Sequence, residues 1–197
     1  MTLLTEHDLR QHHPFPWICV GLLAVMAVAF WIIGHTGASL GTGAALAGCI
    51  ALMLPPRERM AVLPRSLQRL PRIYDAAPVM ATLLSTPGYG LGWFYLDGPY
   101  DEIVHLANGI LAGGVLLALI RRRERRTLHL LMVGTGFGLL LGTAWEVFEA
   151  ITGLIGDWTD TWTDVVLTAA GAGLGVTMAD RWPALRPDPH RTRGVGD

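Results

Sequence analysis

Residues 101–120 of the chain read DEIVHLANGILAGGVLLALI, an almost wholly apolar run that starts with two acids and has a histidine in its second turn. A helix needs about 20 apolar residues to cross the hydrocarbon core of a bilayer, and this run has that length. It contains no arginine or lysine, so no basic side chain of the segment neutralises Asp101. The run is typical of a transmembrane helix with a polar site at one end.

The composition of the whole chain agrees with a membrane protein. Its 197 residues are 51% hydrophobic and 16% charged, whereas about a quarter of the residues of an average soluble domain are charged. All 15 basic residues are arginine. The N-terminus lacks the basic n-region and the small-residue cleavage site of a signal peptide, so we expect its first apolar run to be retained.

Five more apolar runs indicate an all-α, polytopic fold with about six transmembrane helices, of which spans four to six form a three-helix core. The other runs are residues 15–34, 36–54, 76–94, 127–152 and 160–179. We expect five regions along the chain: a cytoplasmic N-terminus (1–14), two N-terminal spans (15–54), a cytoplasmic basic segment (55–75), a four-helix membrane core (76–180) and a disordered cytoplasmic tail (181–197).

The placement of arginine predicts the orientation. Residues 55–75 hold five arginines and form either a broken amphipathic stretch on the membrane surface or a basic loop. Arginines also follow the fourth and sixth spans, whereas the connections after spans one, three and five have none. Because arginine-rich loops stay in the cytoplasm, we expect both termini on the cytoplasmic side of a bacterial inner membrane.

Seven polar residues of spans four to six and their last connection fall near the outer, periplasmic face in this topology. They are Asp101 and His105, Glu146 and Glu149, and Asp157, Asp160 and Asp164. Along each helix the acids continue into small residues at three- and four-residue spacing, which allow membrane helices to approach closely. We therefore expect a tight three-helix core whose outer end opens into an acid-lined cavity.

Acids held together at this depth need a counter-charge, and no arginine is available to supply it. Carboxylates with one imidazole suit a divalent ion, namely Mg²⁺, Mn²⁺, Ca²⁺ or Zn²⁺. The ligands that we expect are Asp101, His105, Glu146, Glu149 and Asp164. Tyr100, Asn108 and Asp157 are further polar residues of the expected site.

Other roles are open for the same side chains. Asp101 and Asp160 can cap the N-termini of their helices. Acids oppose the dipole at a helix C-terminus, so Glu146 and Glu149 are either site residues or a water-exposed interfacial end. His105 can also be a core histidine bonded to a neighbouring carboxylate.

Three motifs in this region carry a family resemblance. They are Tyr100-Asp101-x-x-x-His105, Trp145-Glu146-x-x-Glu149 and Gly156-Asp157-x-x-Asp160-Thr161-x-x-Asp164. Together they resemble the YjdF-type inner-membrane proteins, a family similar in turn to the VanZ-like membrane proteins. The resemblance covers about residues 72–178 and implies no particular activity. VanZ-like proteins are associated with glycopeptide resistance, but Glu102 stands where they commonly carry lysine.

Three functions compete. The first is a metal-dependent hydrolase or transferase for a lipid or lipid-linked substrate, in which Glu149 or Asp160 is the catalytic base. The second is a proton- or cation-coupled transporter, and the third is a non-catalytic protein whose metal or protonated acids fasten the helices. The partners that we expect are membrane lipids, with no nucleic acid and with homo-oligomers left open.

Overall fold

The computed structural model describes residues 13–120, 127–152 and 158–181, and the part of the chain that it describes is helical without strands. The all-α fold expected from the sequence is confirmed. The long helices are α2 (Pro14–Ile32), α3 (Thr36–Met53), α5 (Ala76–Leu91), α6 (Tyr100–Ile120), α7 (Thr127–Thr152) and α8 (Trp158–Arg181). The short elements are η1 (Arg57–Arg59), α4 (Arg65–Gln68), η2 (Arg72–Asp75) and η3 (Trp93–Tyr95).

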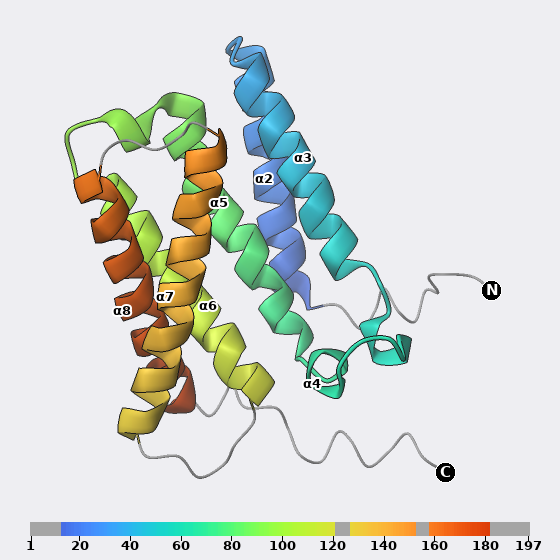
Figure 1. The fold of residues 1–197 in the computed structure, drawn as a ribbon. Coiled ribbons are helices and arrows are strands. Elements are labelled where there is room, and N and C mark those ends of the chain that lie inside the picture. The colour runs from blue at the N-terminus through green and yellow to red at the C-terminus, as the bar shows by residue number, and fades with distance from the viewer. Residues whose placement is uncertain (1–12, 121–126, 153–157, 182–197) are drawn as a thin grey trace.

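Five of these helices, α2, α3, α6, α7 and α8, are long and apolar enough to cross a membrane. The third expected span, α5, has 16 residues and contains Pro87. At 1.5 Å per residue it is about 24 Å long, short of a hydrocarbon core of about 30 Å. It nevertheless runs between the same two ends of the molecule as its neighbours (Figure 1).

The helices form two groups, one of α6, α7 and α8 and one of α2, α3 and α5 (Figure 1). Helix α5 is the member of the second group that packs against α6. In the first group α8 packs closely on both α6 and α7. In the second, α2, α3 and α5 share a small apolar core that contains Leu23, Met53 and Val79. Because α3 and α7 stand on opposite sides of α5, the two groups leave a space between those helices.

Glycine sets the close contact between α6 and α8. A Cβ atom on Gly171 would meet the backbone carbonyl oxygen of Leu106, and one on Gly175 would meet that of Ile110. The two backbones are therefore in direct contact, as the small-residue spacing predicts. This contact brings the first turns of both helices together.

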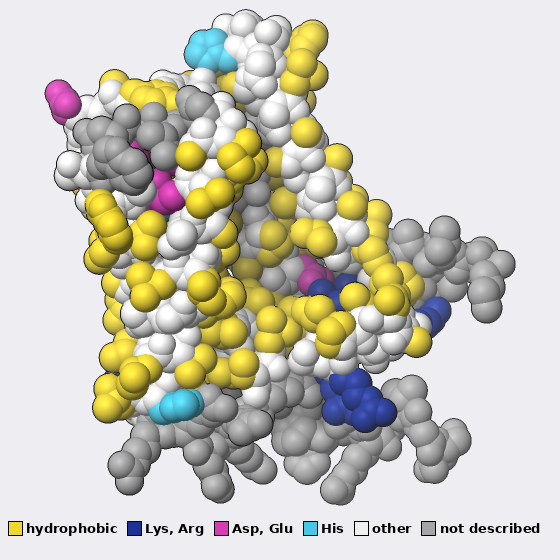
Figure 2. Space-filling view, in the orientation of Figure 1, with side chains coloured by type: hydrophobic (Ala, Val, Ile, Leu, Met, Phe, Trp, Pro, Cys, Tyr) yellow, Lys and Arg dark blue, Asp and Glu magenta, His cyan; other side chains and the backbone are white. Residues whose placement is uncertain are grey.

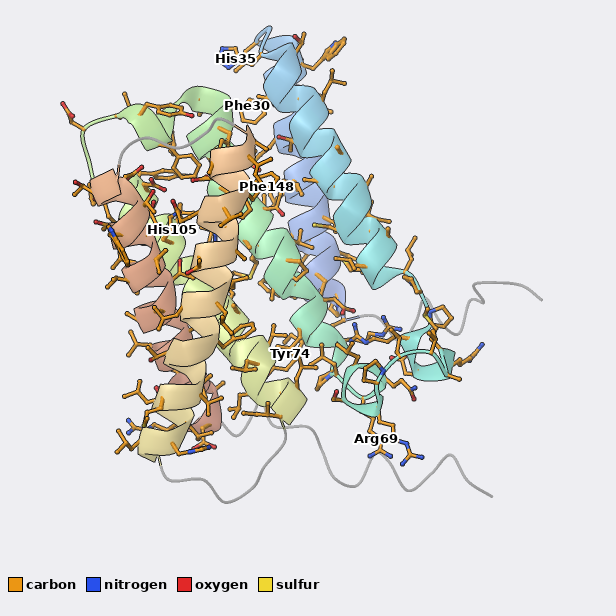
Figure 3. The ribbon with its side chains drawn as sticks, in the orientation of Figure 1. Phe30, His35, Arg69, Tyr74, His105 and Phe148 are labelled. Atoms are coloured by element: carbon orange, nitrogen blue, oxygen red, sulfur yellow. The ribbon has the colours of Figure 1, made fainter. Side chains whose placement is uncertain are left out.

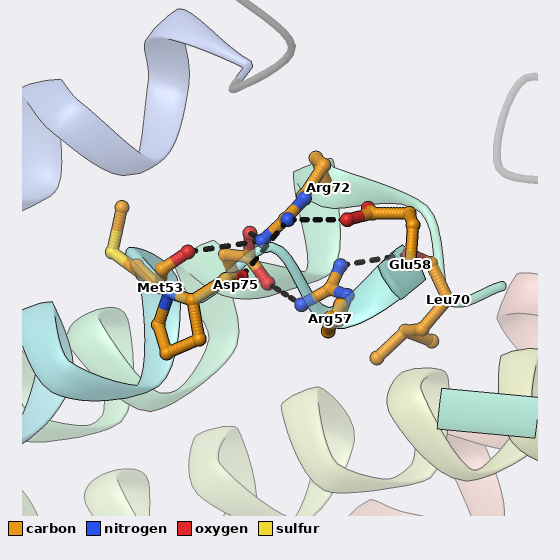
Figure 4. A network of polar contacts seen from close by, with 7 residues as sticks. Met53, Arg57, Glu58, Leu70, Arg72 and Asp75 are labelled. Atoms are coloured by element: carbon orange, nitrogen blue, oxygen red, sulfur yellow. Dashed lines mark hydrogen bonds and ion pairs between the residues drawn. The ribbon is translucent and has the colours of Figure 1, made fainter. Parts of the chain in front are cut away.

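The basic segment folds around buried ion pairs (Figure 4). Arg57 is buried and donates to the carboxylate of Asp75 and, at 2.7 Å, to the carbonyl oxygen of Leu70. Arg72 donates to the carbonyl oxygens of Met53 and Pro55 at 2.9 and 3.1 Å, which ties the end of α3 to the start of α5. Two of the five arginines of this segment thus have a structural role besides the topological one.

The arginines and the site acids lie at opposite ends of the molecule. Figure 2 shows arginine side chains in its lower half, around α4, and acidic side chains near the upper ends of α7 and α8. The structure thus has the separation of charge on which the predicted topology depends. The N-terminal segment and the C-terminal tail of our sequence-based division lie outside the described residues, apart from His13, Pro14 and Arg181.

Candidate metal centre

The centre is built where the first turns of α6 and α8 meet. Asp101 and His105 are four residues apart, so both lie on one face of α6. Asp164 comes from the second turn of α8, on the face that packs against α6. One ligand atom from each of these three residues lies within 4.8 Å of the other two. Sequence positions 63 residues apart thus form one compact group.

His105 lies close to both acids of this group. Its Nε2 atom is 3.5 Å from Oδ1 of Asp101 and 3.6 Å from Oδ2 of Asp164. These distances exceed those of good hydrogen bonds. Bonds of about 2.0–2.2 Å to one ion place neighbouring ligand atoms about 3.0–3.5 Å apart, close to the observed spacing. The other ring nitrogen, Nδ1, is 3.1 Å from the hydroxyl of Thr168, which orients the ring.

Two carboxylate oxygens at the centre are buried without a hydrogen-bond partner among the described residues. They are Oδ1 of Asp164, whose residue is 2% exposed, and Oε1 of Glu146, whose residue is 5% exposed. A buried polar atom without a partner is costly and rare. The group of Asp101, His105 and Asp164 therefore has one unpartnered oxygen available to a divalent ion, and Glu146 has another.

The remaining expected ligands surround this group. Glu146 lies on the buried face of α7, where Thr161 hydrogen-bonds its side chain. Glu149 accepts hydrogen bonds from the hydroxyl of Tyr89 at 2.8 Å and from the indole Nε1 of Trp145 at 3.0 Å. Neither glutamate is part of the compact group of three. Glu149 instead lies where α7 faces the end of α5.

The acids of the three helices are close enough to interact electrostatically, as like charges. Asp101 and Asp164 each interact with the charges of Asp160, Glu146 and Glu149. Asp160 itself is exposed in the first turn of α8. The expected convergence of acids from α6, α7 and α8 on one end of the core is thus present. Asp101 lies in the first turn of α6 rather than at its N-cap, which leaves its carboxylate available to the centre.

The other polar residues of the expected site have different positions. The hydroxyl of Tyr100 donates to the carbonyl oxygen of Leu84 in α5, away from the centre. Asn108 lies one turn below His105 and donates to the hydroxyl of Ser85 at 3.4 Å, while its own Oδ1 is buried without a described partner. Asp157 lies outside the described residues.

Comparison with known proteins assigns the family. Residues 15–184 match the family model described as "Predicted membrane protein (DUF2238)". The chain belongs to the DUF2238 family. No curated protein and no solved structure matches it. The match includes α2 and α3, so it extends beyond the residues 72–178 on which the resemblance noted in the sequence rests.

Beside the centre, the DUF2238 protein contains a cavity of about 1230 Å³. Its lining includes His105 and Thr168 but, among the described residues, no carboxylate. This cavity is therefore not the acid-lined one expected from the sequence, because the acids gather between α6, α7 and α8 while the cavity lies toward α3 and α5. Figure 3 shows His105 within the first helix group and Phe148 on the side of α7 that faces α2 and α3.

Two contacts between residues distant along the chain were not expected from the sequence. Tyr89 holds Glu149 across a separation of 60 residues, and His35 contacts the carbonyl oxygen of Gly90 through Nδ1 at 2.6 Å. Neither residue has a partner at helical spacing, so no local pattern marks it. Thr168 does continue the Asp160–Asp164 face of α8 at four-residue spacing, and that spacing is a signal for it.

Proposed function

We propose that this DUF2238 protein is a bacterial inner-membrane enzyme that uses a divalent metal ion to hydrolyse or transfer a group of a lipid-linked substrate at the outer leaflet. Asp101, His105 and Asp164 hold the ion, and Glu146, whose Oε1 is buried without a described partner, is the fourth ligand of this proposal. In this proposal α5 completes a set of six spans, and both termini are cytoplasmic. Asp101, His105 and Asp164, which hold the ion in this proposal, come from two of the three motifs that resemble those of YjdF-type proteins.

The observation that carries the proposal is the unpartnered, buried Oδ1 of Asp164 beside His105 and Asp101. A purely structural cluster of two acids and a histidine would satisfy that oxygen with a donor. An ion would satisfy it and also supply the positive charge that the described part of the centre otherwise lacks. When bound, such an ion lowers the pKa of a water molecule and polarises a phosphoryl or carbonyl oxygen.

Other residues of the chain then orient the imidazole and transfer the proton. Thr168 orients the imidazole of His105. Glu149 is the general base, because it is less buried than Asp164 and is held by Tyr89 and Trp145 rather than by the group of three. Asp160, exposed in the first turn of α8, is the second candidate for that proton transfer.

Metal analysis of the purified, full-length chain tests the centre. We expect a divalent ion bound to the native protein, removed by a chelator and lost in Asp164→Asn. The matched control is Asp97→Asn, because Asp97 is an exposed acid in the loop before α6. A native protein that binds no divalent ion, or an Asp164→Asn variant that binds it as tightly, would contradict the proposal.

A fastening role is the second candidate, because Asp101, His105 and Asp164 join α6 to α8. Glu149→Gln separates the two roles. Glutamine keeps the hydrogen-bond acceptor for Tyr89 and Trp145 but loses the base, so an enzyme should keep its fold and its metal and lose turnover. Turnover is measured by mass spectrometry of vesicles made from bacterial polar lipid. Unchanged lipid conversion in Glu149→Gln removes Glu149 from catalysis, and no conversion by the native protein favours fastening.

A further inference from the structure

The cavity lies between the two helix groups. Its walls come from α3 on one side and α7 on the other, with α5 and α6 behind them. Along α5 it extends from Ala77 to Gly90, a rise of about 20 Å. Ligand pockets usually have volumes of about 300–1,000 Å³, so a cavity of about 1230 Å³ is large.

Small residues keep the cavity open on the side of α3. Gly37, Gly41 and Ala45 line this wall, and a Cβ atom placed on either glycine would meet no other atom within 4 Å. The opposite wall is large and apolar, with Phe137, Leu141 and Phe148 of α7. Figure 2 shows the surface hollowed between these two helices.

The cavity reaches one residue of the proposed metal centre, His105. His105 and Thr168 line it, and the same two side chains make the 3.1 Å contact that orients the imidazole. Both are more than nine-tenths buried. Asn108, also in the lining, has its buried Oδ1 without a described partner. His105 and Thr168 thus bring a polar part of the wall next to the acids, and the hydroxyls of Thr82, Ser85 and Thr86 elsewhere in the lining bond carbonyl oxygens of their own helix.

We infer that the cavity holds the hydrocarbon tail of a membrane phospholipid whose phosphate lies at the Asp101–His105–Asp164 centre. The helices that carry both walls are long and apolar enough to span a bilayer, so the surrounding medium is lipid. An apolar space at this depth is filled by hydrocarbon rather than water. Phosphate suits a divalent ion, whereas the acids alone would repel it. Placement of the head group therefore rests on the proposed function.

Photolabelling tests this inference. The full-length protein is placed in vesicles of phosphatidylethanolamine and phosphatidylglycerol that contain a trace of phosphatidylglycerol with a diazirine in its acyl chain. Illumination should label residues of the α5 and α6 walls, such as Ala81 and Ala112. In Gly41→Phe, which fills the cavity from α3, this labelling should fall several-fold.

Gly43→Phe is the matched control. Gly43 lies on the same helix, outside this cavity, and a Cβ atom there also meets nothing within 4 Å. It should leave the labelling of α5 and α6 unchanged. Equal labelling of these walls in native protein, Gly41→Phe and Gly43→Phe would show contact with bulk lipid only, and would overturn the inference.

A chelator separates failure of the inference from failure of the proposed function. Labelling that falls with Gly41→Phe and also with chelator supports both the tail site and the head-group site. Labelling that depends on Gly41 but not on the chelator overturns placement of the phosphate at a metal. A protein that binds metal but shows no effect of Gly41→Phe keeps the proposed function and loses the tail site.

Discussion

At the scale of single residues, the contact between His105 and Thr168 determines which ring nitrogen of the imidazole faces the two acids. Nε2 faces Asp101 and Asp164 only because Nδ1 is occupied by the Thr168 hydroxyl on the other side of the ring. Partners of this kind fix the tautomer and orientation of a ligating histidine. Thr168 is therefore a positioning residue with no contact of its own to the proposed ion.

The first prediction concerns this contact. Thr168→Val keeps the shape of the side chain and removes the hydroxyl, so it should lower metal affinity about 10–100-fold with the fold retained. Competitive titration with a metal-sensitive dye measures the affinity. Thr163→Val is the control, since the hydroxyl of Thr163 bonds only the carbonyl oxygen of Thr159 in its own helix among the contacts described. Equal affinities of native protein and Thr168→Val would remove Thr168 from the site.

At the scale of helices, Gly175 of α8 and Gly136 of α7 have different surroundings. Gly175 faces the carbonyl oxygen of Ile110 so closely that even a methyl group requires the helices to separate. Gly136 on α7 is exposed, and a Cβ atom there meets nothing within 4 Å. The same substitution should therefore have opposite effects on stability at the two positions.

Gly175→Ala should destabilise the protein by about 1–3 kcal/mol, because overpacking outweighs the gain in helix propensity. Gly136→Ala should stabilise it by about 0.5–1 kcal/mol through that propensity alone. Unfolding in detergent, followed by circular dichroism under identical heating, gives the order of the two variants around the native protein. A rise in the midpoint for Gly175→Ala would contradict the close contact of α6 and α8.

The ion pairs of the basic segment are a second test at this scale (Figure 4). Asp75 is 5% exposed and pairs with Arg57 and Arg72, so Asp75→Ala leaves buried arginine without its carboxylate. The cost should be about 3–5 kcal/mol. Glu58 also pairs with Arg72, but its side chain is 39% exposed, and Glu58→Ala should cost no more than about 1 kcal/mol. Similar unfolding midpoints for both variants would show that the buried ion pairs of Asp75 stabilise the fold no more than the exposed pair of Glu58.

At the scale of the whole molecule, the separation of charge predicts an orientation. The described arginines gather at the end that contains α4, and the centre lies at the other end. In a bacterial membrane the arginine-rich end stays in the cytoplasm. The centre would then face the outside, where a lipid-linked substrate of the outer leaflet can reach it.

Cysteine labelling tests this orientation. With the two buried native cysteines, Cys19 and Cys49, replaced by alanine, Asp97→Cys should react with a membrane-impermeant maleimide in intact cells. Arg65→Cys, at the arginine-rich end, should react only after the cells are permeabilised. The reverse pattern would place the centre in the cytoplasm. Permeabilised cells, in which both cysteines react, provide the control for accessibility.

Much of this molecule follows from local sequence. The apolar runs specify where α2, α3, α6, α7 and α8 lie, because hydrocarbon requires every backbone hydrogen bond to be made within a helix. The four-residue spacing of Asp101 and His105 places both on one helix face whatever α6 packs against. The glycines of α8 likewise mark a face for close packing, and the structure has that face against α6.

The rest depends on contacts between residues that are distant along the chain. Glu146 continues the buried four-residue glycine row of α7, but no spacing in the sequence predicts that Glu149 contacts Tyr89. The choice of Asp164 as the third member of the compact group follows from the register of α8 on α6, which glycine contacts set across a gap of more than 60 residues. The cavity exists because α3 and α7 stand apart on either side of α5, and a spatial gap between helices has no counterpart in the periodicity of any one of them.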